Sequence, residues 1–219
     1  MISLPYPSFP GATGAHQLRG VGCNKVGKQQ SNSADVTRYK YTTMADFALA
    51  YKRTAQHEGG YSNDPNDRGK MTYAGVARKY HPNWAGWPIV DAVKNKRRGM
   101  FINDPHLKQL VLDFYKTEFW DKMQGDQIHS QRVAEFIYDL HVNSGKKGLM
   151  IAQEAAEVPA DGKYGPKTLA ALNGAQEAVL MLKLMYARLL FICQIVVGDK
   201  SQVKFLGGWL NRINSFKAA

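Results

Sequence analysis

An acidic residue followed by two glycines and a polar loop is the part of this sequence best suited to hydrolytic chemistry. Glu58 stands at the end of a helical pattern, and Gly59 and Gly60 follow it directly. A glycine in the left-handed conformation commonly ends a helix, so this pair is predicted to place Glu58 in the last helical turn. The loop that follows is dense in turn-forming residues. It carries two carboxylates and a hydroxyl, from Asp64, Asp67 and Thr72.

The position predicted for Glu58 favours its protonated form. The C-terminal end of a helix carries partial negative charge, which disfavours an ionised carboxylate. Contacts with apolar neighbours would act in the same direction, because burial disfavours the charged form. Both effects are predicted to raise the pKa of Glu58 toward the range that a general acid needs near neutral pH.

Mainly helical elements are predicted to position these groups. Apolar residues recur at helical spacing from residue 44 to residue 55, which predicts an amphipathic helix ahead of Glu58. Thr43 and Asp46 have the spacing of a capping box at its start. Strand signals are few, so the fold class is mainly α, with at most a small β-hairpin or loop lobe after the catalytic helix. Further helices are predicted at residues 76–80, 89–98, 106–123, 130–143, 147–156, from residue 166 onward, and at residues 175–197. Asp104 with Pro105 marks the start of the helix at 106–123, and Ser130 starts the helix that follows it.

The chain divides into three parts. Residues 1–43 contain many glycines, prolines and polar residues but no apolar periodicity, so we expect an extended or disordered N-terminal arm. Residues 44–125 are expected to form the catalytic region, and residues 126–219 a second helical region. The connections between these two regions are short, which favours one body in which they pack together.

The net charge of +11 narrows the choice of partners. A surplus of positive charge attracts polyanions such as nucleic acid, an anionic membrane or an acidic cell-wall polymer. The sequence has no zinc-finger spacing and no aromatic ribonucleoprotein motif, so nucleic acid is not a predicted partner.

Residues 179–198 are the most hydrophobic tract, but Lys183 and Arg188 interrupt it. A membrane span needs about 20 apolar residues, so this tract is predicted to be a buried helix without stable membrane insertion. The N-terminal residues lack the apolar core of a secretory signal, so synthesis in the cytoplasm is expected. Cys23 and Cys193 are too few for a disulfide framework and are predicted to be free thiols.

The histidines do not predict a metal site. His57 and Glu58 resemble the start of the zinc-peptidase motif HExxH, but residue 61 is a tyrosine where that motif needs its second histidine. The later histidines His81, His129 and His141 show no ligand spacing. No metal and no cofactor is therefore predicted.

Five short segments occur in an order that is typical of one enzyme family. They are HEGGYSNDPNDRG at 57–69, FW at 119–120, FIYDLHVNSG at 136–145, ADGKYGPKTL at 160–169 and GGWLNR at 207–212. Together they resemble glycoside hydrolase family 108, N-acetylmuramidases that occur as phage endolysins and secretion-associated lysozymes, with a C-terminal predicted peptidoglycan-binding region. The resemblance implies a lysozyme-like helical fold and places the family's catalytic acid on Glu58. The segment GKMTYAG at 69–75 departs from the family's usual GGxTNYG, and Lys70 stands where that pattern has a glycine.

The second catalytic group is less determined than the first. Glu58, Asp67 and Thr72 resemble the Glu, Asp and Thr of phage-type lysozymes, with one residue fewer before the threonine. In an inverting glycosidase the second carboxylate holds a water beneath the sugar, which Asp67 with Thr72 could do. Asp64 is the alternative, and a site that relies on Glu58 alone is the third.

The resulting hypothesis is a muramidase that cleaves the β-1,4 bond between N-acetylmuramic acid and N-acetylglucosamine of peptidoglycan glycan strands. Glu58 would protonate the leaving oxygen, and Asp67 and Thr72 would position water. Candidate substrate-binding residues are Tyr61, Asn63, Asp64, Tyr73, Trp84, Trp87, Asp139 and Asn143. The two tryptophans could equally anchor a core, because buried indoles are as common as exposed ones that stack on sugars.

A non-enzymatic hypothesis stays beside this one: a peptidoglycan-binding or assembly component of a phage particle or secretion apparatus, joined to it through residues 1–43. In either case the chain is expected to act at the cell wall after release, secretion or delivery in a phage particle.

Overall fold

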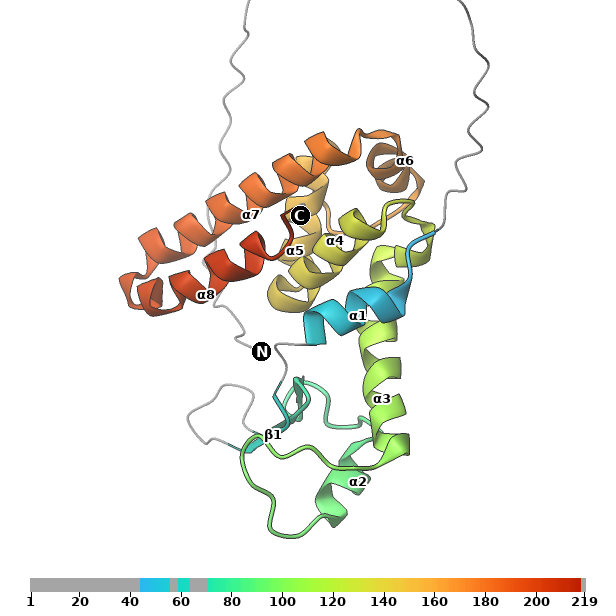
Figure 1. Cartoon of the computed structure of the whole chain (residues 1–219), viewed down its shortest axis with the longest axis vertical. Coiled ribbons are helices and arrows are strands. Elements are labelled where there is room, and N and C mark those ends of the chain that lie inside the picture. Colours follow the sequence, from blue (N-terminus) through green and yellow to red (C-terminus); the bar gives the residue numbers. More distant parts are fainter. Residues whose placement is uncertain (1–43, 56–58, 64–70, 218–219) are drawn as a thin grey trace, which may run out of the picture. The chain divides into compact units, whose positions relative to one another are not determined.

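The computed structural model describes residues 44–55, 59–63 and 71–217, and Figure 1 traces the chain. The described part is mainly helical with one small antiparallel sheet, which confirms the predicted fold class. In chain order the elements are α1 (Phe47–Ala55), β1 (Tyr61–Asn63), β2 (Met71–Tyr73), β3 (Val76–Ala77), α2 (Trp87–Ala92), α3 (Pro105–Tyr115), the π-helix Lys116–Trp120, the 3-10 turns Asp121–Met123 and Gly125–Gln127, α4 (Gln131–Ser144), α5 (Lys146–Ala155), α6 (Pro166–Gly174), α7 (Glu177–Gly198), the 3-10 turn Lys200–Gln202 and α8 (Val203–Asn214).

Helix α1 begins with a cap that differs from the predicted one. The Asp46 carboxylate accepts hydrogen bonds from the backbone N–H groups of Ala48, at 2.6 Å, and Leu49, at 3.2 Å. Asp46 is therefore the residue that satisfies the free amides of the first turn, rather than the third residue of a capping box. The Gln131 side chain holds the same end, accepting from the Asp46 N–H at 2.6 Å and donating to its carbonyl at 3.1 Å. Thr43 lies outside the described residues.

The sheet holds one strand more than a hairpin. In β1 and β2, Tyr61 pairs with Tyr73 and Ser62 with Thr72. β3 then pairs with β2, in place of the short helix predicted at 76–80. Ala74 and Gly75 both have positive φ, 45° and 79°, and this two-residue geometry turns the chain back into a tight hairpin.

The predicted helix at 106–123 is divided in the structure. Asp104 caps α3 by accepting from the Leu107 N–H at 2.8 Å, and Pro105 occupies the first turn as predicted. The α-helical pattern stops at Tyr115 and continues as a π-helix that ends at Trp120. Trp120 is fully buried, and its indole N–H donates to Asp126 at 2.7 Å, so the change of helix type accompanies the burial of the largest side chain.

Helix α4 is the centre of the hydrophobic core. Every residue from Val133 to Val142 is buried, because α1, α5 and α7 all pack against it (Figure 1). Helix α5 comes so close that a Cβ added at Gly148 would lie 2.3 Å from the carbonyl oxygen of Leu140. Glycine at this position therefore permits the two helices to touch through their backbones.

The turn before α6 is held by Gln153, which is 1% exposed. Its side-chain amide donates to Asp161 at 2.9 Å, and its carbonyl oxygen accepts from the Gly162 N–H at 2.7 Å. Gly162 has a φ of 70°, which favours glycine. The segment ADGKYGPKTL at 160–169 thus forms a folded turn, and the Thr168 hydroxyl oxygen accepts a further hydrogen bond from the Gln153 amide at 3.2 Å.

Helix α7 differs from the buried helix predicted for residues 175–197. By length and composition α7 is long and apolar enough to cross a membrane. Only 33% of its most apolar stretch is buried within the described part of the chain. One face packs into the core and the opposite face is exposed, because α4, α5 and α8 contact it on one side only. Cys193 lies on the exposed part as a free thiol, and Cys23 lies outside the described residues.

Candidate active site

The predicted catalytic carboxylates lie outside the described residues, and the structure describes the segments that flank them. Glu58, Asp64 and Asp67 belong to the segments 56–58 and 64–70, so their roles stay predictions. Helix α1 leads into the first of these segments, and the sheet begins directly after it.

The sheet brings the two ends of residues 64–70 together. Asn63 pairs with Met71 at the end of the β1–β2 ladder. Thr72 is half-buried and lies opposite Ser62, next to the loop end, while Asn63 is exposed. The predicted site residues Asn63 and Thr72 therefore share one end of the hairpin that carries Asp64 and Asp67.

Gly60 lies against the backbone of another loop. A Cβ added there would come within 2.3 Å of the Met100 carbonyl oxygen and 2.7 Å of that of Gly99. The neighbouring Tyr61 N–H donates to Met100 at 2.8 Å, and its carbonyl accepts from the Gly99 N–H at 2.7 Å. Gly60 does not have a positive φ, so its role differs from the left-handed helix end that we predicted. Glycine is needed at this position because the backbone at 99–100 lies too close for a side chain.

The two glycines form a matched pair for mutation. Gly60→Ala is expected to lower the free energy of unfolding by about 2 kcal/mol or more, because the new methyl group meets backbone atoms that cannot rotate away. Gly59→Ala is expected to be tolerated, since nothing lies within 4 Å of its added Cβ. Urea denaturation measures the free energy of unfolding of both variants. Equal changes in the two would show that the contact of Gly60 with the backbone at 99–100 does not matter for stability.

The aromatic candidates form a cluster beside the sheet. Trp84 stacks on Tyr73 with ring centroids 6.5 Å apart and meets Trp87 edge-on at 5.1 Å. Trp87 is 2% exposed, and its indole N–H donates to the His81 carbonyl at 2.7 Å. Trp87 is therefore a core residue, which is the alternative to stacking on a sugar. The Trp84 indole N–H also points inward, to the Leu110 carbonyl at 3.4 Å.

The two tyrosine candidates are also largely covered. Tyr73 is 4% exposed, and its hydroxyl oxygen accepts from the Ile102 N–H at 3.1 Å. Tyr61 is buried, with the Lys96 ammonium 5.6 Å from its ring centroid. The Tyr73 hydroxyl and the Tyr61 backbone therefore tie the sheet to the segment 99–102.

Asp139 is the centre of a buried ion-pair cluster. The residue is 1% exposed, and one carboxylate oxygen lies 2.7 Å from Nη1 of Arg188 on α7. The other oxygen accepts from Nε of Arg212 on α8 at 2.8 Å and from the hydroxyl of Thr54 on α1 at 3.4 Å. Burial by itself would raise the pKa of Asp139, but the two guanidinium groups outweigh it and hold the pKa below its ordinary value.

This arrangement changes the role that we predicted for Asp139. A carboxylate enclosed by two arginines offers no free oxygen to a sugar, so the structure supports a positioning role. Asn143 lies one turn further along α4, where its amide donates to the Asp139 carbonyl at 2.6 Å. Arg188, Arg212 and Thr54 were missed because they lie far from Asp139 in sequence. A lone arginine within the apolar tract 179–198 is the signal that could have indicated a buried partner.

His141, on the same helix, is a buried neutral histidine. Burial lowers the pKa of His141 to about 4, and the nearby Phe119 carbonyl, 3.1 Å from Nδ1, opposes this only in part. A carbonyl accepts, so Nδ1 carries the proton of the neutral ring.

Stability is expected to depend on pH through His141. Its folded pKa lies below the ordinary value of 6.5, so the unfolded chain binds more protons and stability falls as pH drops from 6.5 to about 4. The loss from this group reaches about 3 kcal/mol at the low end. Asp139 affects stability in a different, more acidic pH range. Its folded pKa is lowered, so its contribution to stability is lost only as pH falls below the ordinary pKa of an aspartate. Urea denaturation measures the free energy of unfolding at pH 7 and pH 4.5. The difference between the two values should be smaller for His141→Gln than for the unmodified protein. Equal differences would show that His141 is not the source of the pH dependence.

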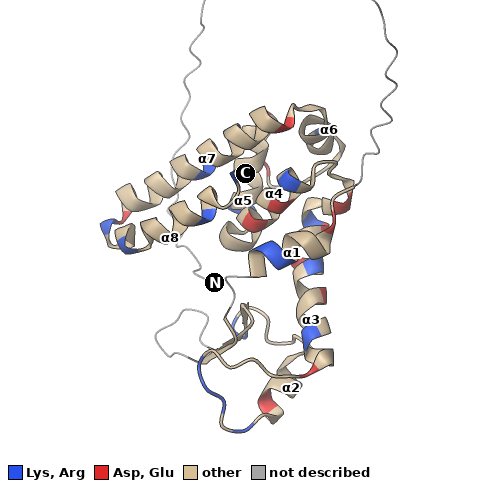
Figure 2. Ribbon diagram, viewed as in Figure 1, with Lys and Arg blue, Asp and Glu red and all other residues tan. Residues whose placement is uncertain are grey.

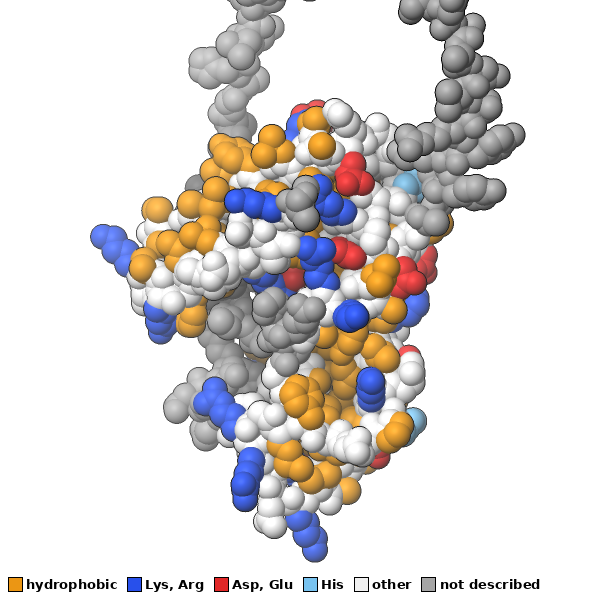
Figure 3. All heavy atoms as spheres, in the orientation of Figure 1, with side chains coloured by type: hydrophobic (Ala, Val, Ile, Leu, Met, Phe, Trp, Pro, Cys, Tyr) orange, Lys and Arg blue, Asp and Glu red, His pale blue; other side chains and the backbone are white. Residues whose placement is uncertain are grey.

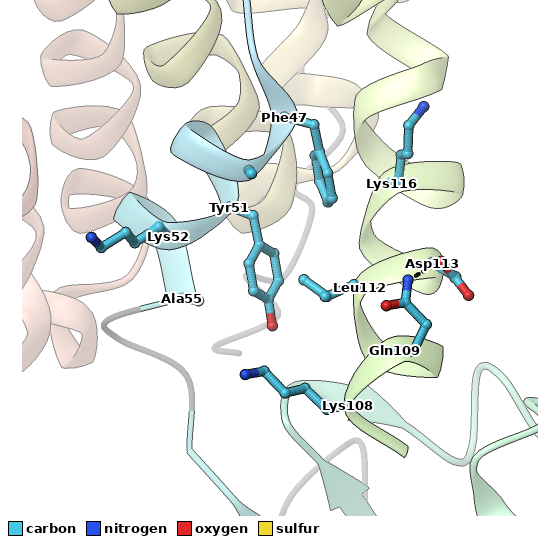
Figure 4. Close-up of a pocket in the computed structure, with 10 residues that line it drawn as sticks. Phe47, Tyr51, Lys52, Ala55, Lys108, Gln109, Leu112, Asp113 and Lys116 are labelled. Carbon is cyan, nitrogen blue, oxygen red and sulfur yellow. Dashed lines mark hydrogen bonds between the residues drawn. The ribbon is translucent and has the colours of Figure 1, made fainter. Parts of the chain in front are cut away.

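A cavity of about 610 Å³ lies along the length of α1, between this helix and α3 with the first residue of the π-helix. Figure 4 shows the Tyr51 ring pointing from α1 toward the side of α3 that carries Lys108 and Leu112, with Ala55 at the last turn. None of the residues that line this cavity is among the predicted site residues. The lining residues are Phe47, Ala48, Tyr51, Lys52, Ala55, Lys108, Gln109, Leu112, Asp113 and Lys116.

The described residues contain no group of three or more histidine, cysteine, aspartate or glutamate side chains arranged to hold a metal ion.

In comparisons with known proteins, two different family models match two successive parts of the chain. Residues 51–145 match the family model described as glycosyl hydrolase 108, and residues 147–214 match the one described as predicted peptidoglycan domain. The two matches meet at the turn between α4 and α5. A solved structure titled "Structure of Brucella abortus SagA" is similar, with 25% sequence identity and a TM-score of 0.56. The similarity covers 78% of this chain and 90% of that one. None of the curated proteins matched.

Proposed function

Because the chain belongs to the glycosyl hydrolase 108 family through residues 51–145 and continues into a predicted peptidoglycan domain, we propose that it cleaves the β-1,4 bond between N-acetylmuramic acid and N-acetylglucosamine. The two matches make the chain a glycoside hydrolase of the lysozyme type that acts on peptidoglycan. The choice of bond and the groups that cleave it are the proposal.

Glu58 is the proposed general acid, and the close packing around Gly60 is the observation that carries this assignment. Residues 60 and 61 are fixed to the backbone at 99–100 on one side of Glu58, and α1 is fixed through Thr54 to Asp139 on the other. A general acid must be positioned for proton transfer to the leaving oxygen, and the described residues on both sides of Glu58 provide fixed attachment points for its segment.

The cavity between α1 and α3 supports a glycan strand as the substrate. Tyr51 and Ala55 line it, and Glu58 follows them in sequence at the spacing of one helical face. An aromatic ring can stack on a sugar, and lysines such as Lys108 can attract the carboxylates of the wall polymer.

Asp67, assisted by the Thr72 hydroxyl, is the proposed second group, with Asp64 as its competitor. The β1–β2 hairpin supports joint action of Thr72 with one of the two aspartates, because Thr72 lies next to the end of the segment that carries both of them. Comparing Asp67→Asn with Asp64→Asn separates the two: the catalytic carboxylate is the one whose loss lowers the maximal rate most.

Product analysis tests the proposed bond. Purified peptidoglycan digested by the protein, reduced with borohydride and analysed by mass spectrometry is expected to yield disaccharide-peptides that end in reduced N-acetylmuramic acid. Products that end in reduced N-acetylglucosamine would contradict the proposal, and so would fragments cut within the stem peptide.

We further propose that the setting is bacterial cell-wall lysis or local wall remodelling, reached by release, secretion or delivery in a phage particle. Residues 1–43 would contact the phage-structural or secretion partner, and they precede the matched regions. Deleting residues 1–43 is expected to spare hydrolysis of purified wall and to reduce delivery.

A further inference from the structure

Helix α7 has two apolar faces, and only one of them is covered. Its buried residues are Leu180, Met181, Leu184, Arg188, Ile192 and Ile195, which follow one another at helical spacing. A helix that is apolar all round usually needs a partner on every side. The described part of the chain leaves the second face of α7 exposed.

The exposed face, which we call the α7 stripe, consists of Val179, Leu182, Tyr186, Leu190, Cys193 and Val197. Leu182 is 70% exposed, Tyr186 60% and Val197 80%, although all three are large side chains. The stripe thus exposes several large apolar side chains on one helix, and contiguous apolar patches of this kind often mark interaction sites. Figure 3 shows hydrophobic side chains gathered over α7.

The core contacts of α7 exclude a membrane-spanning role for this helix in the folded protein. Arg188, halfway along it, is buried against Asp139 at 2.7 Å, and Lys183 at the edge of the stripe pairs with Glu157 at 2.6 Å. Crossing a bilayer would remove Arg188 from its partner and place it in hydrocarbon, which is costly. The stripe can be covered only while α7 stays packed on α4.

Charge distinguishes between the occupants that could cover the stripe. From Val179 to Val197 the helix contains no acidic residue, and the exposed Lys200 and Lys204 follow at its end. The ribbon in Figure 2 is blue at the turn between α7 and α8, where one acidic residue, Asp199, also lies. With a net charge of +11, a second copy of the chain would be repelled, whereas an anionic surface would be attracted. The stripe is mostly apolar, and Tyr186 is the one residue in it that carries a hydroxyl group, so the stripe offers few polar contacts to a sugar polymer.

We propose that the α7–α8 hairpin docks on the surface of an anionic lipid bilayer. The α7 stripe lies at the boundary of headgroups and acyl chains, parallel to the membrane, and Lys200 and Lys204 contact lipid phosphates. On α8, Val203 and Leu210 are also exposed apolar residues. Such docking would hold the hydrolase beside the wall that it cuts, but lipid binding itself does not depend on the proposed cleavage.

Vesicle co-sedimentation of the full chain tests this proposal. The triple variant Leu182→Gln, Tyr186→Gln, Val197→Gln is expected to bind vesicles of phosphatidylcholine with phosphatidylglycerol about tenfold more weakly than the unmodified protein. The matched control replaces three exposed hydrophobic residues elsewhere, Leu49, Tyr80 and Phe101, with Gln and is expected to keep full binding. Lys200→Glu with Lys204→Glu should also weaken binding, and pure phosphatidylcholine vesicles should bind little. Circular dichroism establishes that each variant is folded.

Cys193 supplies a probe within the stripe. In a Cys23→Ser chain labelled at Cys193 with a polarity-sensitive fluorophore, anionic vesicles are expected to shift the emission to the blue. Equal vesicle binding by the triple variant and the unmodified protein would overturn the proposal. A dimer in light scattering that the triple variant abolishes would assign the stripe to a second copy, and loss of binding to purified wall without vesicle binding would assign it to peptidoglycan. Hydrolysis of purified wall separates this test from the proposed cleavage, because the α7 stripe takes no part in it.

Discussion

Replacing Glu58 with Gln is expected to lower the rate of peptidoglycan hydrolysis by about a hundredfold to ten-thousandfold, the usual contribution of a positioned general acid. Gln keeps the size and hydrogen-bonding capacity of the side chain but cannot donate the proton that the leaving oxygen needs. The loss should appear in the maximal rate, with binding to wall largely retained. Release of new reducing ends from purified peptidoglycan measures it.

The matched control for this variant is Glu154→Gln. Glu154 is an exposed acid on α5, outside the candidate site, and its contact with Lys147 is long, at 3.6 Å. Its replacement is expected to leave the rate within about twofold of normal, because exposed ion pairs contribute little. Near-normal activity in Glu58→Gln would remove Glu58 from the mechanism and favour the wall-binding hypothesis for this segment.

Replacing Asp139 with Asn is expected to lower the free energy of unfolding by about 3 to 5 kcal/mol. The substitution leaves Arg188, which is 5% exposed, and Arg212 without their counter-charge in the core. The cost of an unpaired buried charge exceeds the value of any single hydrogen bond that Asn could keep. Urea denaturation at pH 7 gives the difference directly.

An exposed ion pair provides the control for Asp139. Asp91 binds Arg78 through two hydrogen bonds, at 2.7 and 2.9 Å, but both side chains are more than a third exposed. Asp91→Asn is expected to change the free energy of unfolding by less than about 1 kcal/mol. An effect of Asp139→Asn as small as that would show that the buried cluster is not needed to hold α1, α4, α7 and α8 together.

Features that depend on neighbours in sequence were predicted well. Asp104 with Pro105 at the start of α3 and Ser130 at the start of α4 behave as the sequence indicates, because a cap bonds to amides two or three residues away. The mainly helical class and the family resemblance likewise rest on local periodicity and on short contiguous motifs. The helix predicted at 76–80 was wrong because the turn at Ala74 and Gly75, which both have positive φ, directs the chain into β3 instead.

The sequence by itself determined the mainly helical class of this protein and its resemblance to one enzyme family, because helical periods and contiguous motifs are local in the chain. It also predicts the segment that carries the general acid, residues 57–69. Only the tertiary structure decided how the described residues on either side of that segment pack. Gly60 is needed because it touches the backbone at 99–100, and Asp139 belongs to the core because Arg188 and Arg212 reach it from α7 and α8. Such roles depend on distances between residues far apart in the chain, which packing sets and local patterns do not encode.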